Sequence, residues 1–380
     1  MDCLHISDSV ERGTIIDQAR DPHYAASGVD STKAEAGLDK LRAWVDQTFP
    51  FNPSARPHLP LGYFSNIIRL DGLNLGIAIT TDGVRTKLLV AELMEKYDTV
   101  GIDCIAMNVN DLLCVGATPI SFVDYLAVET LHPDVLDALG QGLCRGAELA
   151  RVNISGGEIA LLKEMIRGIQ DGSGLDLAGT AIGTVPLDRV IIGKDIQPGD
   201  TVIGLASSGI HSNGLSLARQ ILLKGAQLTV GSHLQEFGHA VGEELLEPTH
   251  IYLPEITAMF AAGLNLKALI HITGDGFFNL TRTGAAIGYH IHTLPPPLPI
   301  FTVLQDAGHL TDAEIYQVYN MGIGFCVIVA ETEADRVMRI TAKHDIHAWQ
   351  IGTTVESPER TITIESRQLQ SREGHFVSLK

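Results

Sequence analysis

Acidic, hydroxyl and lysine side chains follow the end of an expected strand near residue 80, in an order suited to binding phosphate. The β-favouring run at 77–80 stops at Asp82 and Gly83, and Thr86 and Lys87 follow at once. Asp82 could bind a metal ion, Thr86 could hydrogen-bond a phosphate oxygen, and Lys87 could neutralise phosphate charge. The segment therefore points to nucleotide chemistry, with an ordinary Asp-Gly turn as the alternative.

A second candidate lies on the helix expected at 99–115, whose polar face carries acids and amides but no lysine or arginine. At about 100° per residue, Asn110 lies about 20° from Asp103 around the helix axis and Asp111 about 80° away, so the three side chains form one stripe. Carboxylates among cysteine, methionine and valine residues are expected to be partly buried, and buried carboxylates need a cation. Mg²⁺ with a nucleotide polyphosphate is one such cation, and a structural network of buried acids is the alternative.

A glycine pair after the helix at 133–150 adds a candidate ligand contact. Gly156 and Gly157 would let a ligand approach the backbone closely, and the Glu158 carboxylate follows directly. A tight bend explains the pair equally well. The chain contains neither a Gly-x-Gly-x-x-Gly fingerprint here nor a Gly-x-x-x-x-Gly-Lys-Ser/Thr motif, so neither a Rossmann nor a Walker site is supported.

The segment at 207–214 combines serine, glycine and histidine between an expected strand and an expected helix. The first backbone N–H groups of a helix are unsatisfied, so such a loop can hold an anion. His211 could hold a phosphate or act as an acid, while an ordinary loop histidine is the alternative. The segment at 271–278 repeats the strand end, glycine-rich turn and polar donors. Several such loops in one chain are stronger evidence for a ligand site than any one alone.

Composition indicates a folded enzyme without nucleic-acid or membrane partners. The 380 residues are 45% hydrophobic and carry a formal charge of −18, which would repel nucleic acid and anionic membrane. No apolar run approaches the roughly 20 residues that span a bilayer, and residues 1–8 lack the features of a signal peptide, so a cytoplasmic location is expected. Five widely spaced cysteines without a Cys-x-x-Cys pair indicate reduced thiols.

Helical and strand patterns alternate along the chain and predict a mixed α/β fold, with two domains from the length. Helices are expected at 31–44, 99–115, 133–150 and 215–224, and strands at 67–70, 75–80, 120–128, 176–185, 201–206 and 323–330. A polar stretch between Pro186 and Pro198 is expected to separate the domains. The predicted units are an N-terminal extension at 1–22, domains at 23–187 and 188–365, and a C-terminal tail at 366–380.

Motifs spread in order from about Tyr24 to Gly352 match one known enzyme family. They are Ser27-Gly28-Val29-Asp30, Thr81-Asp82-Gly83-Val84 with Thr86-Lys87, Gly101 to Leu112, Gly156-Gly157-Glu158, Ser207 to Gly214, Pro248-Thr249 with Tyr252, His271-Ile272-Thr273-Gly274, Asn320 to Gly324 and Ala348 to Gly352. In these residues the chain resembles the aminoimidazole ribonucleotide synthetases, which are phosphoribosylformylglycinamidine cyclo-ligases of the PurM-like superfamily.

The resemblance implies a two-domain PurM-like α/β fold. The N-terminal domain would pair with its copy in a homodimer to form a shared β-barrel, and ATP would lie close to that interface. The implied reaction is the ATP-dependent closure of formylglycinamidine ribonucleotide to aminoimidazole ribonucleotide in purine biosynthesis, with release of ADP and phosphate.

The resemblance also implies roles for individual residues. Catalysis would fall to His211, His271 and Lys87, and Mg²⁺ to Asp82 and Asp111. ATP and its phosphates would contact Asp82, Gly83, Thr86, Lys87, Asp103, Asn110, Gly156, Gly157 and Glu158. The substrate would contact Ser208, Gly209, Ser212, Asn213, Thr273 and Gly274.

Four positions depart from the family pattern. Ala25 replaces a lysine, Arg85 a glycine and Leu161 a glutamate, and Asp275 interrupts a run of three glycines. We hypothesise that Arg85 replaces the charge lost at Ala25. The departures leave two alternatives open: a divergent PurM-like paralogue that uses ATP on another substrate, such as a thiamine-phosphate kinase, or a non-catalytic nucleotide-binding homologue.

Overall fold

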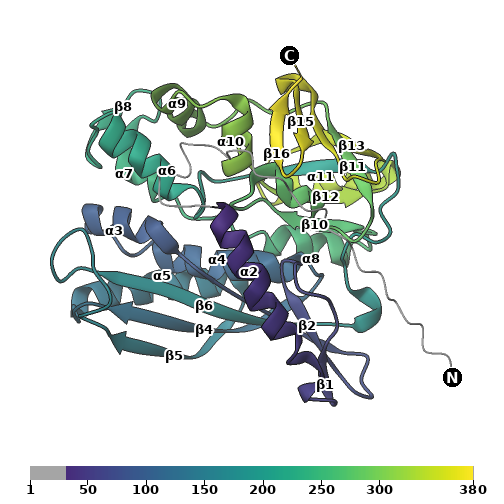
Figure 1. Ribbon diagram of the computed structural model, residues 1–380, viewed down its shortest axis with the longest axis horizontal. Helices are drawn as coiled ribbons and strands as arrows, with labels where there is room; N and C mark the ends of the chain where they lie inside the picture. The colour runs from purple at the N-terminus through teal and green to yellow at the C-terminus, as the bar shows by residue number, and fades with distance from the viewer. Residues whose placement is uncertain (1–30, 380) are drawn as a thin grey trace.

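The protein is built from two mixed α/β halves, each around its own sheet (Figure 1). The computed structural model describes residues 31–379. The predicted extension at 1–22 and Ala25 therefore lie outside the described residues. The mixed α/β class is confirmed. No helix among the described residues combines the length and the apolar character needed to cross a membrane.

The N-terminal half contains a six-stranded sheet in the order β1-β2-β3-β6-β4-β5. Its strands are β1 (Ala55–Pro57), β2 (Asn66–Leu70), β3 (Gly76–Gly83), β4 (Thr118–Val128), β5 (Asn153–Leu161) and β6 (Leu175–Val185). Neighbouring strands run antiparallel except β4 and β5, which are parallel. A parallel pair needs a crossover, and helix α5 (Pro133–Ala150) provides it.

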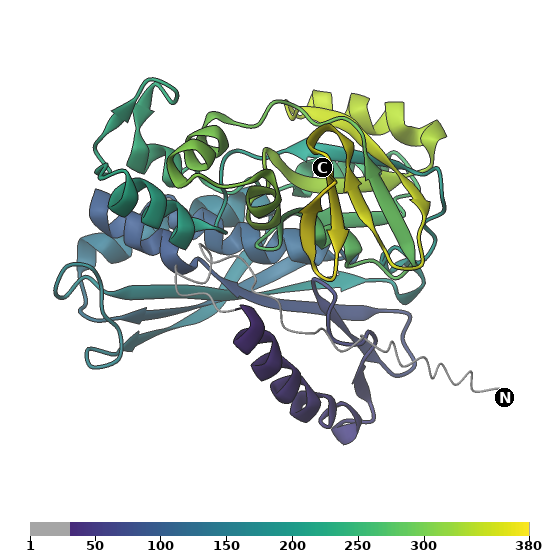
Figure 2. The same cartoon turned by 45° about the horizontal axis from the view of Figure 1, so that its top comes forward.

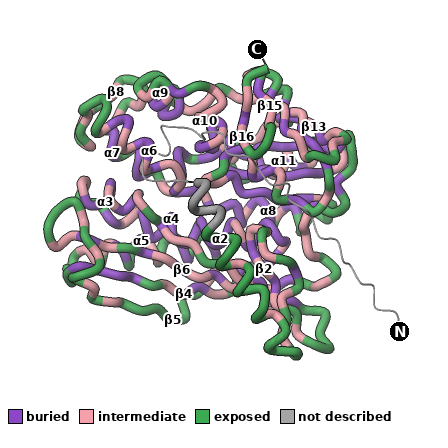
Figure 3. Tube along the Cα trace, viewed as in Figure 1, coloured by how far each residue is buried: buried purple, intermediate pink, exposed green. Residues whose placement is uncertain are grey.

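Helices separate this sheet from the C-terminal half. They are α3 (Leu88–Met94), α4 (Val100–Leu113) and α5, and Figure 2 shows them between the lower sheet and the upper half of the molecule. Helix α2 (Ser31–Asp46) lies on the outside. Short 3₁₀ helices lie between α2 and β1 (η1, Phe49–Phe51), between β3 and α3 (η2, Arg85–Lys87) and between β6 and β7 (η3, Leu187–Arg189). Helix α4 is buried over almost its whole length, as Figure 3 shows at the centre of the molecule.

The C-terminal half contains an eight-stranded sheet in the order β10-β12-β7-β13-β11-β14-β15-β16. Its strands are β7 (Thr201–Ala206), β10 (Ala268–His271), β11 (Ile287–Ile291), β12 (Ile323–Val329), β13 (Ala348–Glu356), β14 (Ile362–Ile364), β15 (Leu369–Arg372) and β16 (His375–Ser378). Strands β8 (His233–Leu234) and β9 (His239–Ala240) form a separate hairpin. Every residue of β12 is buried, which explains its unbroken apolar sequence.

The helices of the C-terminal half are mostly short. They are α6 (Leu215–Arg219), α7 (Val241–Leu245), α8 (Leu253–Ala261), α9 (Pro299–Gly308), α10 (Asp312–Val318) and α11 (Ala334–Lys343), with 3₁₀ helices η5 (Gly276–Thr281), η6 (Glu331–Glu333) and η7 (Glu365–Arg367). Helix α6 continues into a π-helical turn, η4 (Gln220–Gly225), and the two together replace the single helix predicted at 215–224.

Two segments differ from the sequence prediction. The Gly156-Gly157 pair lies inside strand β5, at the edge of the sheet, and not in a tight bend. The predicted tail instead contains β15 and β16, which extend the C-terminal sheet, and Phe376 of β16 packs against Phe278 with ring centroids 4.6 Å apart. The domain boundaries themselves stay a prediction.

Glycines let helices α4 and α5 approach closely, and this contact fixes the position of α4. A Cβ atom added at Gly101 would lie 2.3 Å from the backbone nitrogen of Leu143, and one at Gly142 would lie 2.6 Å from the carbonyl oxygen of Asp98. Both neighbours are backbone atoms, which cannot rotate away. The helix that carries the polar stripe is therefore seated directly on α5.

The substitution Gly101→Ala should destabilise the protein by about 1–3 kcal/mol, because the new methyl group overpacks a backbone contact. The control is Gly140→Ala on α5, where an added Cβ meets nothing within 4 Å. That change should stabilise by about 0.5–1 kcal/mol through helix propensity. Urea unfolding measures both values, and equal effects of the two substitutions would contradict the close approach.

Candidate active site between the two halves

The polar side chains of helix α4 form one stripe, as the sequence predicts, and the structure shows that this stripe faces the C-terminal half. The Asn110 side chain donates to the His250 carbonyl at 2.9 Å and accepts from the Tyr252 backbone N–H at 3.0 Å. Asp103 and Asp111 also contact residues of the C-terminal half. The stripe is therefore an interface between the halves, and the side chains predicted to bind ligands lie along it.

A fully buried ion pair lies at the start of the stripe. The Lys87 ammonium lies 3.0 Å from Oδ1 and 2.9 Å from Oδ2 of Asp103, and both side chains have 0% exposure. Lys87 also donates to the Glu247 carbonyl at 2.6 Å. Asp103 Oδ1 further accepts from the Ser212 hydroxyl at 3.1 Å and from the Thr249 hydroxyl at 2.6 Å. The cation beside this buried carboxylate is thus a lysine of the same chain, and the predicted contacts of Lys87 and Asp103 with phosphate stay a prediction.

Asp111 and His271 form a second pair across the interface. Nδ1 of His271 lies 2.9 Å from Oδ1 of Asp111, and the histidine is fully buried. Burial raises the pKa of Asp111, and the hydrogen bond from His271 opposes that rise. Nε2 of His271 is buried without a hydrogen-bond partner among the described residues. With Nδ1–H donated to the carboxylate, Nε2 carries the lone pair and can accept a proton.

The His211 side chain is buried in the same region, on a backbone with a positive φ of 63°. Its Nε2 accepts from the Ser208 backbone N–H at 3.4 Å, so Nδ1 carries the proton in the neutral ring, and Nδ1 has no partner among the described residues. Burial holds the pKa of His211 well below its usual range, and the nearby His271 and Lys87 lower it further. The two imidazoles thus offer one unpaired donor and one unpaired acceptor.

The packing around His211 leaves no spare volume on its inner side. A Cβ atom added at Gly324 would lie 2.2 Å from the Tyr252 hydroxyl and 2.5 Å from Cε1 of His211. The glycine in the Asn320 to Gly324 motif is therefore required by close approach. It lets the buried ring of His211 lie against strand β12.

Asp82 lies at the end of β3, where the sequence predicts it. Its Oδ1 accepts from the Gly83 backbone N–H at 2.7 Å and from the Arg85 guanidinium at 2.9 Å. Asp82 is near enough to Asp111 that its charge raises the pKa of that carboxyl. Arg85 itself has a φ of 63°, a left-handed backbone in which glycine is the residue without a steric penalty.

The residues present fit a Mg²⁺ ion that also binds phosphate. Mg²⁺ is usually held by one or two carboxylates together with substrate phosphates and water. Asp82 and Asp111 supply two partly exposed carboxylates, at 17% and 15% exposure, from neighbouring elements. The described residues contain no cluster of three or more acidic, histidine or cysteine side chains that could hold a metal by itself. A metal ion at this site would therefore also need phosphate oxygens as ligands.

The residues predicted on the substrate side lie around the two histidines. The Ser208 hydroxyl donates to the Pro248 carbonyl at 2.5 Å, and the Asn320 side chain donates to the Gly209 carbonyl at 3.0 Å. Gly274 faces Asn213, whose side-chain oxygen would lie 3.1 Å from an added Cβ. The Thr273 hydroxyl lies 3.3 Å from the Asn279 side-chain oxygen. Thr86, which was predicted to contact ATP, lies with its hydroxyl 3.0 Å from that of Ser216.

No hydrogen bond or ion pair among the described residues joins the segment from Gly156 to Glu158 to His211 or His271. All three residues are exposed on edge strand β5. A Cβ atom added at Gly157 would lie 2.4 Å from the Asp124 carboxylate, so a larger residue there would require the Asp124 side chain to move. Leu161, at the end of the same strand, is 58% exposed. The predicted nucleotide contact of this segment stays a prediction.

Two buried asparagines that shape the site lie within the matched motifs, but no role was predicted for them from the sequence. Asn108 accepts from the Asp82 backbone N–H at 2.9 Å and donates to the Asp82 carbonyl at 3.1 Å, which fixes the end of β3. Asn320 accepts from the Ser207 hydroxyl at 3.0 Å and holds the loop of His211. The available signal was an amide within an otherwise apolar stretch, since a buried amide needs partners.

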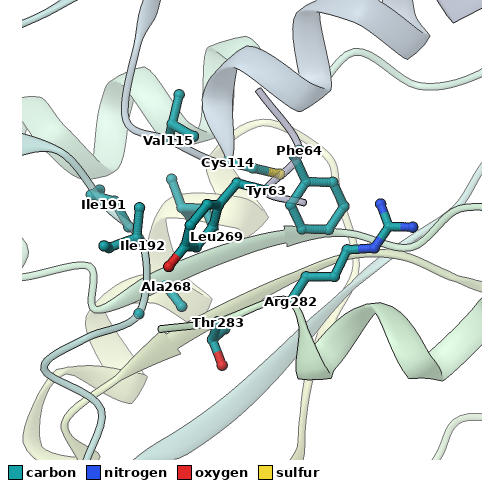
Figure 4. A pocket seen from close by; sticks show the side chains of 11 residues that line it. Tyr63, Phe64, Cys114, Val115, Ile191, Ile192, Ala268, Leu269, Arg282 and Thr283 are labelled. Atoms are coloured by element: carbon teal, nitrogen blue, oxygen red, sulfur yellow. The ribbon is translucent and has the colours of Figure 1, made fainter. Parts of the chain in front are cut away.

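Asp275, one of the departures from the family pattern, is paired with Arg282 at 2.7 Å. The Arg282 guanidinium, in the C-terminal half, lies over the Phe64 ring of the N-terminal half, 5.2 Å from its centre. This contact joins the two halves. Figure 4 shows Arg282 and Phe64 at the edge of a cavity that Tyr63 and Cys114 also line. Its volume of about 10 Å³ holds about one water molecule, so this cavity is not the nucleotide site.

The four cysteines in the described residues are free thiols, and Cys104, Cys114 and Cys326 are buried while Cys144 is exposed. The prediction of reduced, mostly buried cysteines is confirmed for these four. Burial raises the pKa of Cys114 well above its usual range, which makes it a poor nucleophile.

Replacing Arg85 tests its strained backbone. Arg85→Gly should be more stable than Arg85→Ala by about 1 kcal/mol, because both lose the pair with Asp82 but only glycine removes the left-handed penalty. The control is Arg145, on helix α5. There the glycine variant should be less stable than the alanine variant by a similar amount, because glycine is the poorer helix former. Chemical unfolding gives both differences, and the same order at both positions would count against the strain.

The lowered pKa of His211 makes stability depend on pH. Below the unfolded pKa of about 6.5, the unfolded state binds a proton that the folded state does not bind. The free energy of unfolding is therefore unaffected by the titration of this histidine above about pH 6.5. It falls as the pH drops below that value, by up to about 1.4 kcal/mol per pH unit. His211→Asn should flatten the difference in unfolding free energy between pH 7.5 and 5.5, whereas His292→Asn, at an exposed histidine, should leave it in place. An unchanged difference in His211→Asn would refute the assignment.

Two family models match the chain. The model described as AIR synthase related protein, N-terminal domain, covers residues 65–185, and that described as AIR synthase related protein, C-terminal domain, covers residues 197–365. Solved structures show the same fold at low identity. The thiamine-monophosphate kinase of Stenotrophomonas maltophilia has a TM-score of 0.54 at 20% identity, covering 79% of this chain and 89% of that one. Phosphoribosylformylglycinamidine synthase II of Thermotoga maritima has a TM-score of 0.53 at 15% identity, covering 83% and 47%.

Curated relatives are much more similar. The phosphoribosylformylglycinamidine cyclo-ligase of Methanothermobacter thermautotrophicus is 46% identical over 317 residues, which are 83% of this chain and 90% of that protein. The enzyme of the same name from Methanocaldococcus jannaschii is 48% identical over 284 residues, covering 74% and 79%. The chain therefore belongs to the phosphoribosylformylglycinamidine cyclo-ligase family of enzymes, also called AIR synthases.

Proposed function

We propose that the protein closes the imidazole ring of aminoimidazole ribonucleotide from formylglycinamidine ribonucleotide, with ATP converted to ADP and phosphate. The observation that carries the proposal is the meeting of Asp111 and His271 across the two halves, beside the buried His211. This arrangement lies in a chain that shares 46% of its residues with a cyclo-ligase over most of its length. The same proposal includes ATP as a substrate and Mg²⁺ as its counter-ion.

The chemistry explains why ATP is needed. An amide oxygen is a poor leaving group, whereas phosphate is a good one. In the proposed sequence the formyl oxygen attacks the γ-phosphate and releases ADP. An internal nitrogen of the substrate then attacks the activated carbon, and phosphate leaves as the ring closes. Mg²⁺ at Asp82 and Asp111 would supply charge neutralisation at the phosphates when bound.

The two histidines suit different parts of this sequence. Nε2 of His271 is the unpaired acceptor, so it can take the proton that the attacking nitrogen loses. Nδ1–H of neutral His211 is the unpaired donor, so it can hydrogen-bond an oxygen of the substrate or of the departing phosphate. Asp111 keeps His271 in the tautomer that leaves Nε2 free. The low pKa of His211 keeps its ring neutral near pH 7.

A cytoplasmic homodimer is part of the proposal. Edge strands with exposed apolar side chains tend to pair with another chain. In the N-terminal sheet, β4 and the edge strand β5 expose large apolar side chains at Ile120, Tyr125, Ile154, Ile159 and Leu161. Pairing of this edge with a second copy would cover them. The implied shared β-barrel and the nucleotide contact of Gly156, Gly157 and Glu158 would both lie there.

The decisive experiment supplies the purified protein with ATP, Mg²⁺ and formylglycinamidine ribonucleotide and follows ADP and the aminoimidazole product together. Equal amounts of both are expected. His271→Gln should lower kcat by about 10²–10⁴, the usual contribution of a general base, and Asp111→Asn should also lower it because the tautomer is no longer fixed. His292→Gln is the control at an exposed histidine.

Two results would contradict the proposed reaction, and a third would contradict only the role of His271. ADP without aminoimidazole would indicate a paralogue that phosphorylates another substrate. ATP binding without ADP would indicate a non-catalytic homologue. Full activity of His271→Gln would leave the cyclisation in place but remove the histidine from it.

A further inference from the structure

Residues 247–252, which we call the clamp segment, join α7 to α8 without regular structure. Thr249, Ile251 and Tyr252 are buried, so the backbone polar groups of this segment must find partners inside the protein. A buried loop of this kind is unusual, because loops normally leave their polar groups to water. The residues that supply these partners therefore show what holds the segment in place.

Side chains of the N-terminal half supply the partners. Lys87 donates to the Glu247 carbonyl at 2.6 Å, and Asp103 accepts from the Thr249 backbone N–H at 2.8 Å. Asn110 donates to the His250 carbonyl and accepts from the Tyr252 N–H. Three side chains of one half thus satisfy four backbone groups of the other.

The spacing of these contacts follows from secondary structure. Asp103 and Asn110 are seven residues apart on α4, which is about two turns and about 10 Å. Three extended residues span about the same length, which matches the path from Thr249 to Tyr252. The helix therefore holds the clamp segment in one register.

The clamp segment in turn contacts the loop that carries His211. The Ser208 hydroxyl donates to the Pro248 carbonyl at 2.5 Å, and the Tyr252 hydroxyl donates to the Ala206 carbonyl at 2.8 Å. Ser212, next to His211, donates to the same Asp103 oxygen that holds Thr249. The position of His211 relative to α4, and so relative to Asp111, is set through these contacts.

We propose that Lys87, Asp103 and Asn110 are positioning residues that act on the reaction through the clamp segment, with Lys87 neutralising Asp103 and not touching a phosphate. Their effect is to hold His211 in register with the Asp111–His271 pair. The kinetic consequence rests on the proposed function, whereas the consequence for the position of the loop does not.

The first test removes one hydroxyl. Thr249→Val deletes the 2.6 Å bond to Asp103, keeps the shape of the side chain and leaves both charges paired. We expect kcat to fall about tenfold or more from misalignment, with KM for ATP within about threefold of wild type. Thr249→Ser should restore kcat. The control is Thr341→Val, at an equally buried threonine of α11 that donates to its own helix at 3.0 Å, and it should leave kcat unchanged.

Hydrogen exchange tests the same inference without a measurement of catalytic turnover. Amides of residues 206–214 should exchange faster in Thr249→Val than in wild type, and Thr341→Val should not change them. Unchanged exchange in Thr249→Val would overturn the inference even if the cyclisation is established. Faster exchange in a protein without cyclisation would uphold the clamp and refute the proposed function alone.

The role of Lys87 is tested by nucleotide affinity. Lys87→Met combined with Asp103→Leu removes both buried charges together, so that neither is left unpaired. We expect the Kd of a non-hydrolysable ATP analogue with Mg²⁺ to stay within about threefold of wild type while kcat falls, as for Thr249→Val. An increase of about tenfold or more in that Kd, absent in Thr249→Val, would assign Lys87 to the phosphates and overturn this part of the inference.

Discussion

The buried Lys87–Asp103 pair is the interaction on which the arrangement of the two halves depends. Two opposite charges without exposure are costly to remove from water, and they are tolerated only when each finds several partners. Here the partners are a carbonyl of residue 247, the hydroxyls of Ser212 and Thr249, and a backbone N–H. All of these groups belong to the C-terminal half. The ion pair is thus satisfied only when the halves are correctly placed.

That dependence explains why the site can be divided between two sheets. The carboxylates of Asp82 and Asp111 belong to elements of the N-terminal half, and the imidazoles of His211 and His271 belong to strand ends and loops of the C-terminal half. Preorganised donors and acceptors lower a barrier only if their geometry does not change during the reaction. A contact surface made of apolar side chains alone would permit small rotations. Buried polar groups with fixed partners permit fewer, because each displaced bond leaves an unsatisfied group.

The sequence predicts the secondary structure better than it predicts the tertiary contacts of individual side chains. Helical periodicity correctly places Asp103, Asn110 and Asp111 on one stripe, because the angle between side chains follows from the backbone alone. The partner of Asp103 at Thr249 is 146 residues away, and no local pattern encodes such a contact. Strand β5 was missed for a different reason. Glycine has low strand propensity, and the cross-strand pairing with β4 that stabilises it is not visible in a local window.

Three of the four positions that depart from the family pattern, Arg85, Leu161 and Asp275, lie among the described residues, at places where change disturbs little of this framework. Arg85 and Asp275 each pair with a partially exposed neighbour, Asp82 and Arg282, through ion pairs that contribute little energy. Leu161 is exposed on the edge strand. By contrast, Gly324 and the residues around Asp103 are buried, where even one methyl group or one missing donor has a large cost. The contrast argues that the framework holding the two histidines is more constrained than the surface around the predicted phosphate site, and that variation in substrate handling would arise at that surface first.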